Sequence, residues 1–249
     1  PLAAILRDPH PRLRGAPAVA GDRPWHDRES QLDAGQLPLA RPCGLPDVRQ
    51  HDRPDPGIEL LAAPVMRGAR YEDRPVYFSD VVVRRDSVFS TFADLRGASW
   101  AYNEPGSHSG YNVVRYHLAV LGEASGYFGQ VIESGAHQLS LQMILDGRIH
   151  ASAIDSTVLE QEFRREPAIR SKVRIVDALG PSPIPPWVVQ RYLSPDLRSS
   201  LRDLLLGMHQ DPEGRAVLAA GHMTCFARVE DTDYDLIREM ARLAESVRL

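Results

Sequence analysis

Lysine is nearly missing from this 249-residue chain, because Lys172 is the only lysine among 29 basic residues. The formal net charge is −4 and the pI is near 6.2, so the overall charge indicates neither nucleic acid nor a membrane surface as a partner. The preference for arginine, together with 20 prolines, is typical of a GC-rich coding sequence. A single arginine is therefore weak support for a binding role.

Cysteines and long apolar runs are also scarce. Cys43 and Cys225 are the only cysteines, and they lie in no spacing typical of a metal site, so two separate thiols are the simpler interpretation. No apolar run approaches the ~20 residues that a transmembrane helix requires. No signal peptide is recognised, which fits a mature exported protein, a fragment and a cytoplasmic protein equally well.

Motifs for metal, nucleotide and acyl-transfer chemistry are missing too. The sequence has no HExxH, EF-hand, Walker or GxGxxG pattern. The run GSHSG is close to the hydrolase motif GxSxG, but His108 stands where the nucleophilic serine is required. We therefore expect no metal, no cofactor and no catalytic residue, and a function in binding.

Strands and helices alternate through most of the chain. The strongest strand pattern, at 76–83, is β-branched and aromatic throughout. Alternation with helical segments predicts an α/β fold with mainly parallel sheets and helices on both faces. Residues 1–36 show no lasting period and are predicted to be irregular. Predicted strands lie at 37–40, 58–65, 76–83, 98–102, 127–132, 149–154, 173–178 and 187–189, and helices at 107–121, 137–146, 156–164, 195–208, 212–220 and 234–247.

The most informative run is NEPGSHSGY at 103–111, between a predicted strand and a predicted helix. Glycines and hydroxyl side chains at a helix start leave N–H and O–H groups to donate to an anion, and the helix dipole favours negative charge there. The alternative is that Ser107 only caps the helix. The candidate ligands are Ser107, His108, Ser109, Gly110 and Tyr111.

Two more polar junctions follow later strands. His137 is predicted to donate to an anion, or else to cap or pack. Asp155, followed by Ser156, is predicted to accept a hydrogen bond from a protonated oxygen or an ammonium group of a ligand, or else to cap a helix. Because the carboxyl ends of parallel strands meet at one edge of a sheet, we expect these junctions to converge. Gly44 and Tyr77 are candidates for the opposite wall, although a buried tyrosine is more often core.

These stretches, in this order, resemble the phosphate/phosphite/phosphonate ABC-transporter substrate-binding proteins, which have the type II periplasmic-binding-protein fold. The resemblance runs from about residue 40 to the C-terminus. Two positions depart from the family pattern, since Ala136 replaces the usual serine and Asp47 replaces a frequent aromatic residue. The matching stretches are 43–46, 78–83, 92–97, 103–111, 146–148, 153–156 and 179–186.

The resemblance implies two α/β lobes joined by two crossover segments. Residues 1–84 and 182–249 would form the first lobe, in which 1–36 are irregular or incomplete, and 85–181 would form an inserted second lobe. It further implies that Ser107, His108 and Ser109, the turn ending at His137, and the pair Asp155 and Ser156 bind the ligand.

The hypothesis is a non-enzymatic solute-binding protein. It would close around a phosphonate or phosphate-like anion and deliver it to an ABC permease, in the periplasm as the resemblance implies. The alternatives are a cytoplasmic ligand-sensing domain of the same fold and, with less support, an enzyme acting on a phosphorylated small molecule. The enzyme alternative lacks a nucleophile–base pair.

Overall fold

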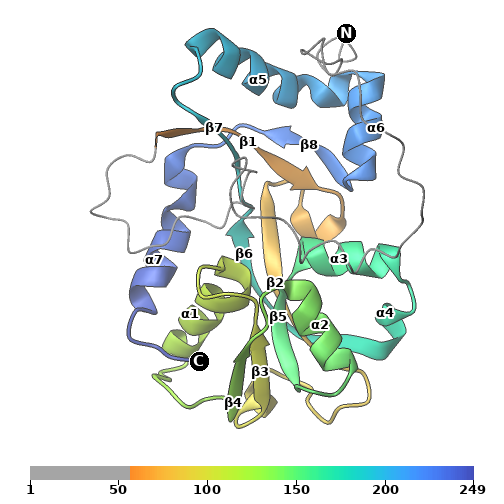
Figure 1. The fold of residues 1–249 in the computed structure, drawn as a ribbon, viewed down its shortest axis with the longest axis vertical. Coiled ribbons are helices and arrows are strands. Elements are labelled where there is room, and N and C mark those ends of the chain that lie inside the picture. Colours follow the sequence, from red (N-terminus) through yellow and green to blue (C-terminus); the bar gives the residue numbers. More distant parts are fainter. Residues whose placement is uncertain (1–56) are drawn as a thin grey trace, which may run out of the picture. The chain divides into compact units, whose positions relative to one another are not determined.

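The computed structural model describes residues 57–249, which contain two β-sheets (Figure 1). The smaller sheet has the order β7-β1-β8, and the larger has the order β4-β3-β5-β2-β6. Their strands are β1 (Ile58–Met66), β2 (Val76–Arg84), β3 (Ser99–Tyr102), β4 (Gln130–Glu133), β5 (Ala151–Asp155), β6 (Val173–Pro183), β7 (Trp187–Gln190) and β8 (Met223–Ala227).

Strand directions differ between the two sheets. In the larger sheet β3 is parallel to β4 and β5, whereas β2 is antiparallel to β5 and β6. Every strand but β2 therefore runs the same way, and the carboxyl ends of β3, β4 and β5 share one edge. In the smaller sheet both described pairings are antiparallel, so the expectation of mainly parallel sheets is wrong there. The central strand β1 runs in one direction, and its two neighbours β7 and β8 both run in the opposite direction.

Strands β2 and β6 are the two crossover segments. β1 leads through a short turn into β2, and β6 leads into β7, while β2 and β6 pair along most of their length. Strand β6 continues into the proline-rich stretch after residue 180 and ends at Pro183. Proline is tolerated there since β6 is at the edge of its sheet.

Helices cover both faces of the larger sheet, as predicted. On β2, Val81 and Val83 face one hydrophobic cluster and Val82 faces another, because side chains alternate along a strand. The first cluster contains residues of α1 and the second contains residues of α2, α3 and α4. The helices are α1 (Val113–Val120), α2 (His137–Leu145), α3 (Ser156–Arg165), α4 (Ile169–Lys172), α5 (Pro195–Gly207), α6 (Pro212–Ala220) and α7 (Asp235–Leu243), with 3₁₀ turns at η4 (Ala69–Tyr71), η5 (Ala93–Leu95), η7 (Met208–Gln210) and η8 (Asp231–Tyr234).

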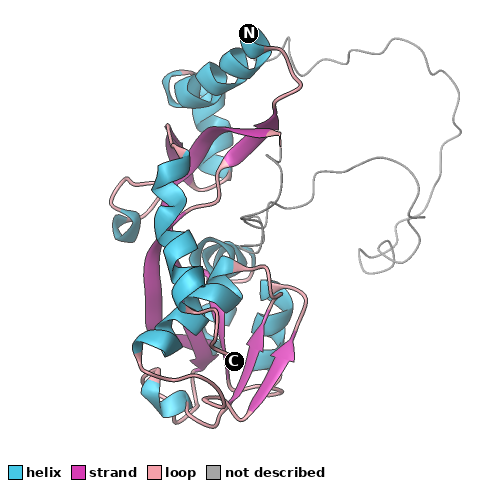
Figure 2. Ribbon diagram, turned by 90° about the vertical axis from the view of Figure 1, so that its left-hand side faces the viewer, coloured by secondary structure: helices cyan, strands magenta, loops and turns pink. Residues whose placement is uncertain are grey.

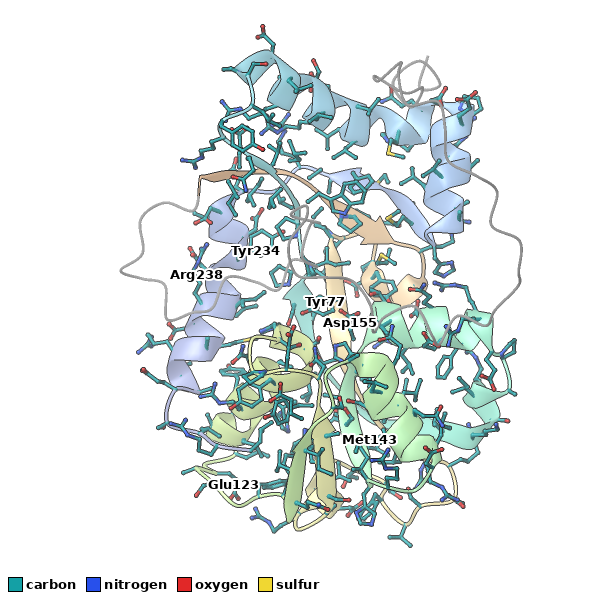
Figure 3. All side chains as sticks on the ribbon, viewed as in Figure 1. Tyr77, Glu123, Met143, Asp155, Tyr234 and Arg238 are labelled. Carbon is teal, nitrogen blue, oxygen red and sulfur yellow. The ribbon has the colours of Figure 1, made fainter. Side chains whose placement is uncertain are left out.

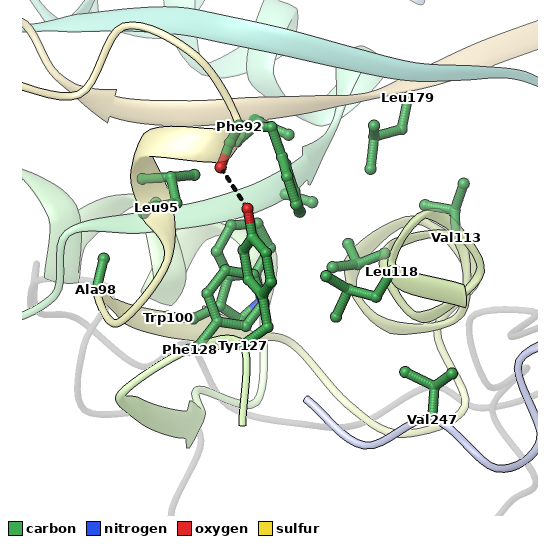
Figure 4. Packing of buried hydrophobic residues seen from close by; sticks show 14 of the residues in the cluster. Phe92, Leu95, Ala98, Trp100, Val113, Leu118, Tyr127, Phe128, Leu179 and Val247 are labelled. Carbon is green, nitrogen blue, oxygen red and sulfur yellow. Dashed lines mark hydrogen bonds between the residues drawn. The ribbon is translucent and has the colours of Figure 1, made fainter. Parts of the chain in front are cut away.

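An aromatic core fixes β3 and the segment that precedes β4 (Figure 4). The rings of Trp100 and Phe128 stack with centroids 4.4 Å apart, and the Tyr127 hydroxyl donates to the Phe92 carbonyl at 3.1 Å. Stacked aromatic pairs contribute beyond their buried area. The polar run after β3 therefore starts from a rigid strand.

The last helix packs on α1 (Figure 2). Met240 of α7 and Val247 beyond it lie in the same cluster as Val113, and Arg115 Nε donates to the Val247 carbonyl at 2.9 Å. By contrast, α5 and α6 contribute Leu205 and Leu218 to a cluster on the smaller sheet. Residues 182–249, all assigned to the first lobe, thus contact both sheets, and the lobe boundaries stay a prediction.

Most predicted elements between residues 58 and 249 are present with small shifts at their ends. β8 was missed, since its five residues follow a helix without a clear alternating pattern. The predicted strand at 127–132 begins three residues later, and the last helix is shorter than predicted. The strand at 37–40 and the irregular stretch at 1–36 lie outside the described residues. Within residues 57–249, no helix is long and apolar enough to cross a membrane.

Candidate functional site

The polar run after β3 forms a buried turn at the start of a helix. A π-helical turn, η6 (His108–Asn112), continues directly into α1. Ser107, His108 and Ser109 are 8%, 4% and 5% exposed. The Gly110 N–H donates to Ser107 Oγ at 3.1 Å, so the capping alternative holds for Ser107, whose hydroxyl proton is still available to a ligand.

The second junction meets this turn. His137 is the first residue of α2, and its Nε2 lies 3.0 Å from Ser109 Oγ. Gly135 N–H donates to the Asn103 carbonyl at 2.8 Å, which joins the two loops through the backbone. Ala136, the N-cap of α2, supplies no side-chain cap. The first N–H groups of α2 therefore lack the hydroxyl partner that a serine would provide.

Gly110 allows close packing of neighbouring side chains against the turn. A Cβ at this position would lie 1.9 Å from Asn103 Oδ1 and 3.2 Å from His137 Cε1. The Asn103 side chain is thus pressed against the turn, and its Oδ1 is buried without a partner in the described part of the chain. Asn103 stood in the informative run but was not among the predicted site residues, because its contact depends on the folded turn.

Tyr77 lies beside the same turn, at the start of β2. Its ring is 2% exposed, and its centroid is 6.4 Å from that of His108 in an edge-on arrangement. Burial raises the pKa of Tyr77, the charge of Asp155 raises it further, and a hydrogen bond with Ser109 lowers it. Tyr77 is therefore a neutral phenol beside the turn. We call Tyr77, Ser107, His108, Ser109 and His137 the turn cluster.

Asp155 ends β5 near Tyr77 (Figure 3). Its Oδ1 accepts from the N–H of Thr157 at 2.8 Å and from the Thr157 hydroxyl at 2.7 Å, so it caps α3 as the alternative interpretation expected. Burial raises its pKa, the hydrogen bonds from Thr157 lower it, and Asp80 adds a repulsion that raises it. A carboxyl group with a raised pKa takes up a proton more readily than an exposed one.

Ser156 and Tyr111 are placed differently. Ser156 is fully buried, where its Oγ accepts from the Phe78 N–H at 3.1 Å and lies 3.2 Å from the Tyr71 hydroxyl. Its hydroxyl is therefore not joined to the turn cluster. Tyr111 is half-buried and packs its ring on Tyr102 at 4.9 Å. Gly44 lies outside the described residues.

The turn cluster is electrically neutral at pH 7. Burial lowers the pKa of His108 to about 4 and that of His137 to about 4. The Nδ1 atoms of both rings are buried and have no protein partner among residues 57–249. In the same part of the chain, no group of three or more histidine, cysteine, aspartate or glutamate residues is arranged to hold a metal ion. The cluster can offer uncharged donors to an anion.

The described chain joins two sheets through the paired strands β2 and β6 and brings two polar strand–helix junctions together at one edge of the larger sheet. A sequence model of the family described as "ABC transporter, phosphonate, periplasmic substrate-binding protein" matches residues 25–234. The chain belongs to this family of substrate-binding proteins.

Solved structures of similar proteins show the same type II periplasmic-binding-protein fold. The binding component of a Pseudomonas aeruginosa ABC phosphonate transporter is 20% identical with a TM-score of 0.65, over 76% of this chain and 63% of that one. PhnD1 from Prochlorococcus marinus, solved with methylphosphonate, is 18% identical with a TM-score of 0.65, over 77% and 73%. The Xanthomonas citri protein XAC2383, solved with ATP, is 21% identical with a TM-score of 0.58, over 76% and 71%.

Family membership confirms the class of function predicted from the sequence. The chain is a solute-binding protein of the phosphonate ABC-importer type, and its family comprises binding proteins rather than enzymes. The family implies a small anionic ligand and a location outside the cytoplasm.

Proposed function

We propose that the turn cluster binds the phosphonate or phosphate group of the transported solute. The main support is the 3.0 Å approach of Ser109 Oγ to His137 Nε2, which brings two separate strand–helix junctions to one point. Hydroxyls, neutral imidazole and the N–H groups at the start of α2 are the donors that suit the oxygens of an anion. Tyr77 adds a phenol beside Ser109.

Asp155 favours a ligand that brings its own proton or cation. A carboxylate beside a bound dianion would cost Coulomb energy in a partly desolvated site. Burial already raises the pKa of Asp155 before any anion arrives. A monoprotonated phosphonate, or one with an ammonium group, removes the conflict by donating to the carboxylate.

Binding would be coupled to closure about β2 and β6. These crossover strands connect the two sheets, and hinges in two-lobed proteins lie in such connecting segments. The ligand would shift the equilibrium toward the closed form by binding that form more tightly. In this proposal the closed protein delivers its ligand to an ABC permease from the periplasm.

Isothermal titration calorimetry tests the proposed function. The purified full chain is titrated with phosphate, phosphite, methylphosphonate and 2-aminoethylphosphonate, and we expect micromolar or tighter binding of at least one. Ser152→Ala is the matched control for serine variants of the turn cluster and should bind like the wild type. Ser152 is a fully buried serine of β5, and its hydroxyl donates to the neighbouring Ala153 carbonyl at 3.4 Å. Absence of heat with all four anions, from protein shown by circular dichroism to be folded, would contradict the proposal.

A further inference from the structure

His108 connects the turn cluster to a buried residue outside it. Its Nε2 lies 3.0 Å from Ser182 Oγ, and both residues are buried, with 4% and 1% exposure. The hydroxyl oxygens of Ser107 and Ser109 instead lie 3.5 Å from each other, and Ser109 Oγ also lies within hydrogen-bond distance of His137 Nε2. The middle residue of the SHS sequence is thus held by a strand that is distant in sequence.

Ser182 belongs to crossover strand β6 and is paired with Tyr77 of crossover strand β2. Ser109, the residue next to His108, lies close enough to Tyr77 to lower its pKa. Consecutive residues of one turn therefore contact both crossover strands at directly opposed positions. A displacement of the turn by a bound anion would be transmitted to β6 through the short contact between His108 and Ser182, and to β2 because Ser182 pairs with Tyr77.

We propose that His108 is a positioning residue that couples occupation of the anion site to the geometry of the crossover strands through Ser182. This inference rests on the proposed function. In this role His108 acts through its bond to Ser182, which fixes where Ser107 and Ser109 present their hydroxyls. Loss of the bond would let the turn move independently of β6, and the ligand would then have to order the turn itself.

The test compares ligand affinity with stability in His108→Gln, His108→Leu and Ser182→Ala. The glutamine keeps a side-chain amide that can either donate to or accept from the Ser182 hydroxyl, whereas leucine has a similar size and no hydrogen-bonding group. We expect Ser182→Ala and His108→Leu to weaken methylphosphonate binding by about 3- to 10-fold, which is the value of one hydrogen bond, and His108→Gln to retain most of the affinity. Ser152→Ala is the control and should bind like the wild type.

A double-mutant cycle on affinity separates positioning from simple support of the fold. The double variant His108→Leu/Ser182→Ala should bind about as weakly as either single variant, because both remove the same contact. Unchanged affinity in all variants, with a lower free energy of unfolding in urea, would overturn the inference and leave the proposed function standing. A wild-type protein that binds none of the four anions would overturn both.

Discussion

Two polar clusters include residues of β2, Tyr77 in the turn cluster and Asp80 in the other, and they differ in charge and in how completely their atoms are paired. The arginine cluster consists of Arg70, Tyr71, Asp80, Ser156 and Glu160. Arg70 holds Asp80 with two hydrogen bonds of 2.9 and 2.6 Å, and the Tyr71 hydroxyl donates to Glu160 at 2.8 Å. The turn cluster is neutral, and both of its imidazoles keep a buried Nδ1 without a partner in the described residues.

We propose that this difference separates a structural contact from a binding site. A paired charge cluster satisfies its own atoms and holds the turn after β1 against α3. Unpaired buried atoms cost free energy, so a site that retains them is suited to a guest that supplies the missing partners. We therefore expect changes in the arginine cluster to lower stability and changes in the turn cluster to lower affinity.

The largest effect is expected for Arg70→Met. Asp80 is 1% exposed and would lose its cation, which leaves a carboxylate buried without its partner. The free energy of unfolding should fall by about 3 kcal/mol. This value is the lower end of the range for breaking a buried ion pair, because Arg70 is partly exposed. Urea unfolding followed by circular dichroism measures this. A loss below about 1 kcal/mol would show that the pair matters little.

Ser109→Ala should act on affinity instead. The substitution removes the hydroxyl that lies near Tyr77 and His137. Binding of methylphosphonate should become less favourable by about 1–3 kcal/mol, which raises the dissociation constant roughly 5- to 150-fold. Calorimetric titration gives the dissociation constant, with Ser152→Ala as the control. Equal dissociation constants for the variant and the wild type would remove Ser109 from the site.

A pH titration of ligand-free protein distinguishes the clusters by charge. Burial lowers the pKa of His137 from 6.5 to about 4, so the unfolded chain takes up the proton first as the pH falls. The stability that this residue confers is present above pH 6.5 and is lost as the pH falls toward 4.

His137→Gln removes this dependence. Between about pH 7 and pH 5 the variant should lose roughly 2 kcal/mol less unfolding free energy than the wild type does. Urea unfolding at both pH values provides the comparison. Parallel pH profiles for the two proteins would mean that His137 is not buried as a neutral ring.

The smallest effect is expected for Tyr71→Phe. Loss of its bonds to Glu160 and Ser156 should lower the free energy of unfolding by about 1 kcal/mol. Methylphosphonate affinity should stay unchanged, because this hydroxyl belongs to the arginine cluster. A larger dissociation constant for Tyr71→Phe than for the wild type would indicate that Ser156, which contacts Tyr71, belongs to the binding site, as predicted from the sequence.

The sequence predicts local structure well here because caps and periodicity are local. Asp155 and Ser107 are recognisable as caps, and both accept the expected backbone hydrogen bonds. Ser156 shows the limit, since its hydroxyl binds Tyr71, which is 85 residues away and carries no motif. The contact between His108 and Ser182 joins residues 74 positions apart, and no sequence pattern predicted it. Such pairings depend on strand order, which local patterns do not encode.

The most direct test of the central claim is a crystal structure of the full chain with methylphosphonate. The account predicts phosphonate oxygens within hydrogen-bond distance of Ser109 Oγ and His137 Nε2, and a protonated oxygen directed at Asp155. A phosphonate bound against Arg70, or anywhere that leaves Ser109 and His137 without contact to it, would contradict the account.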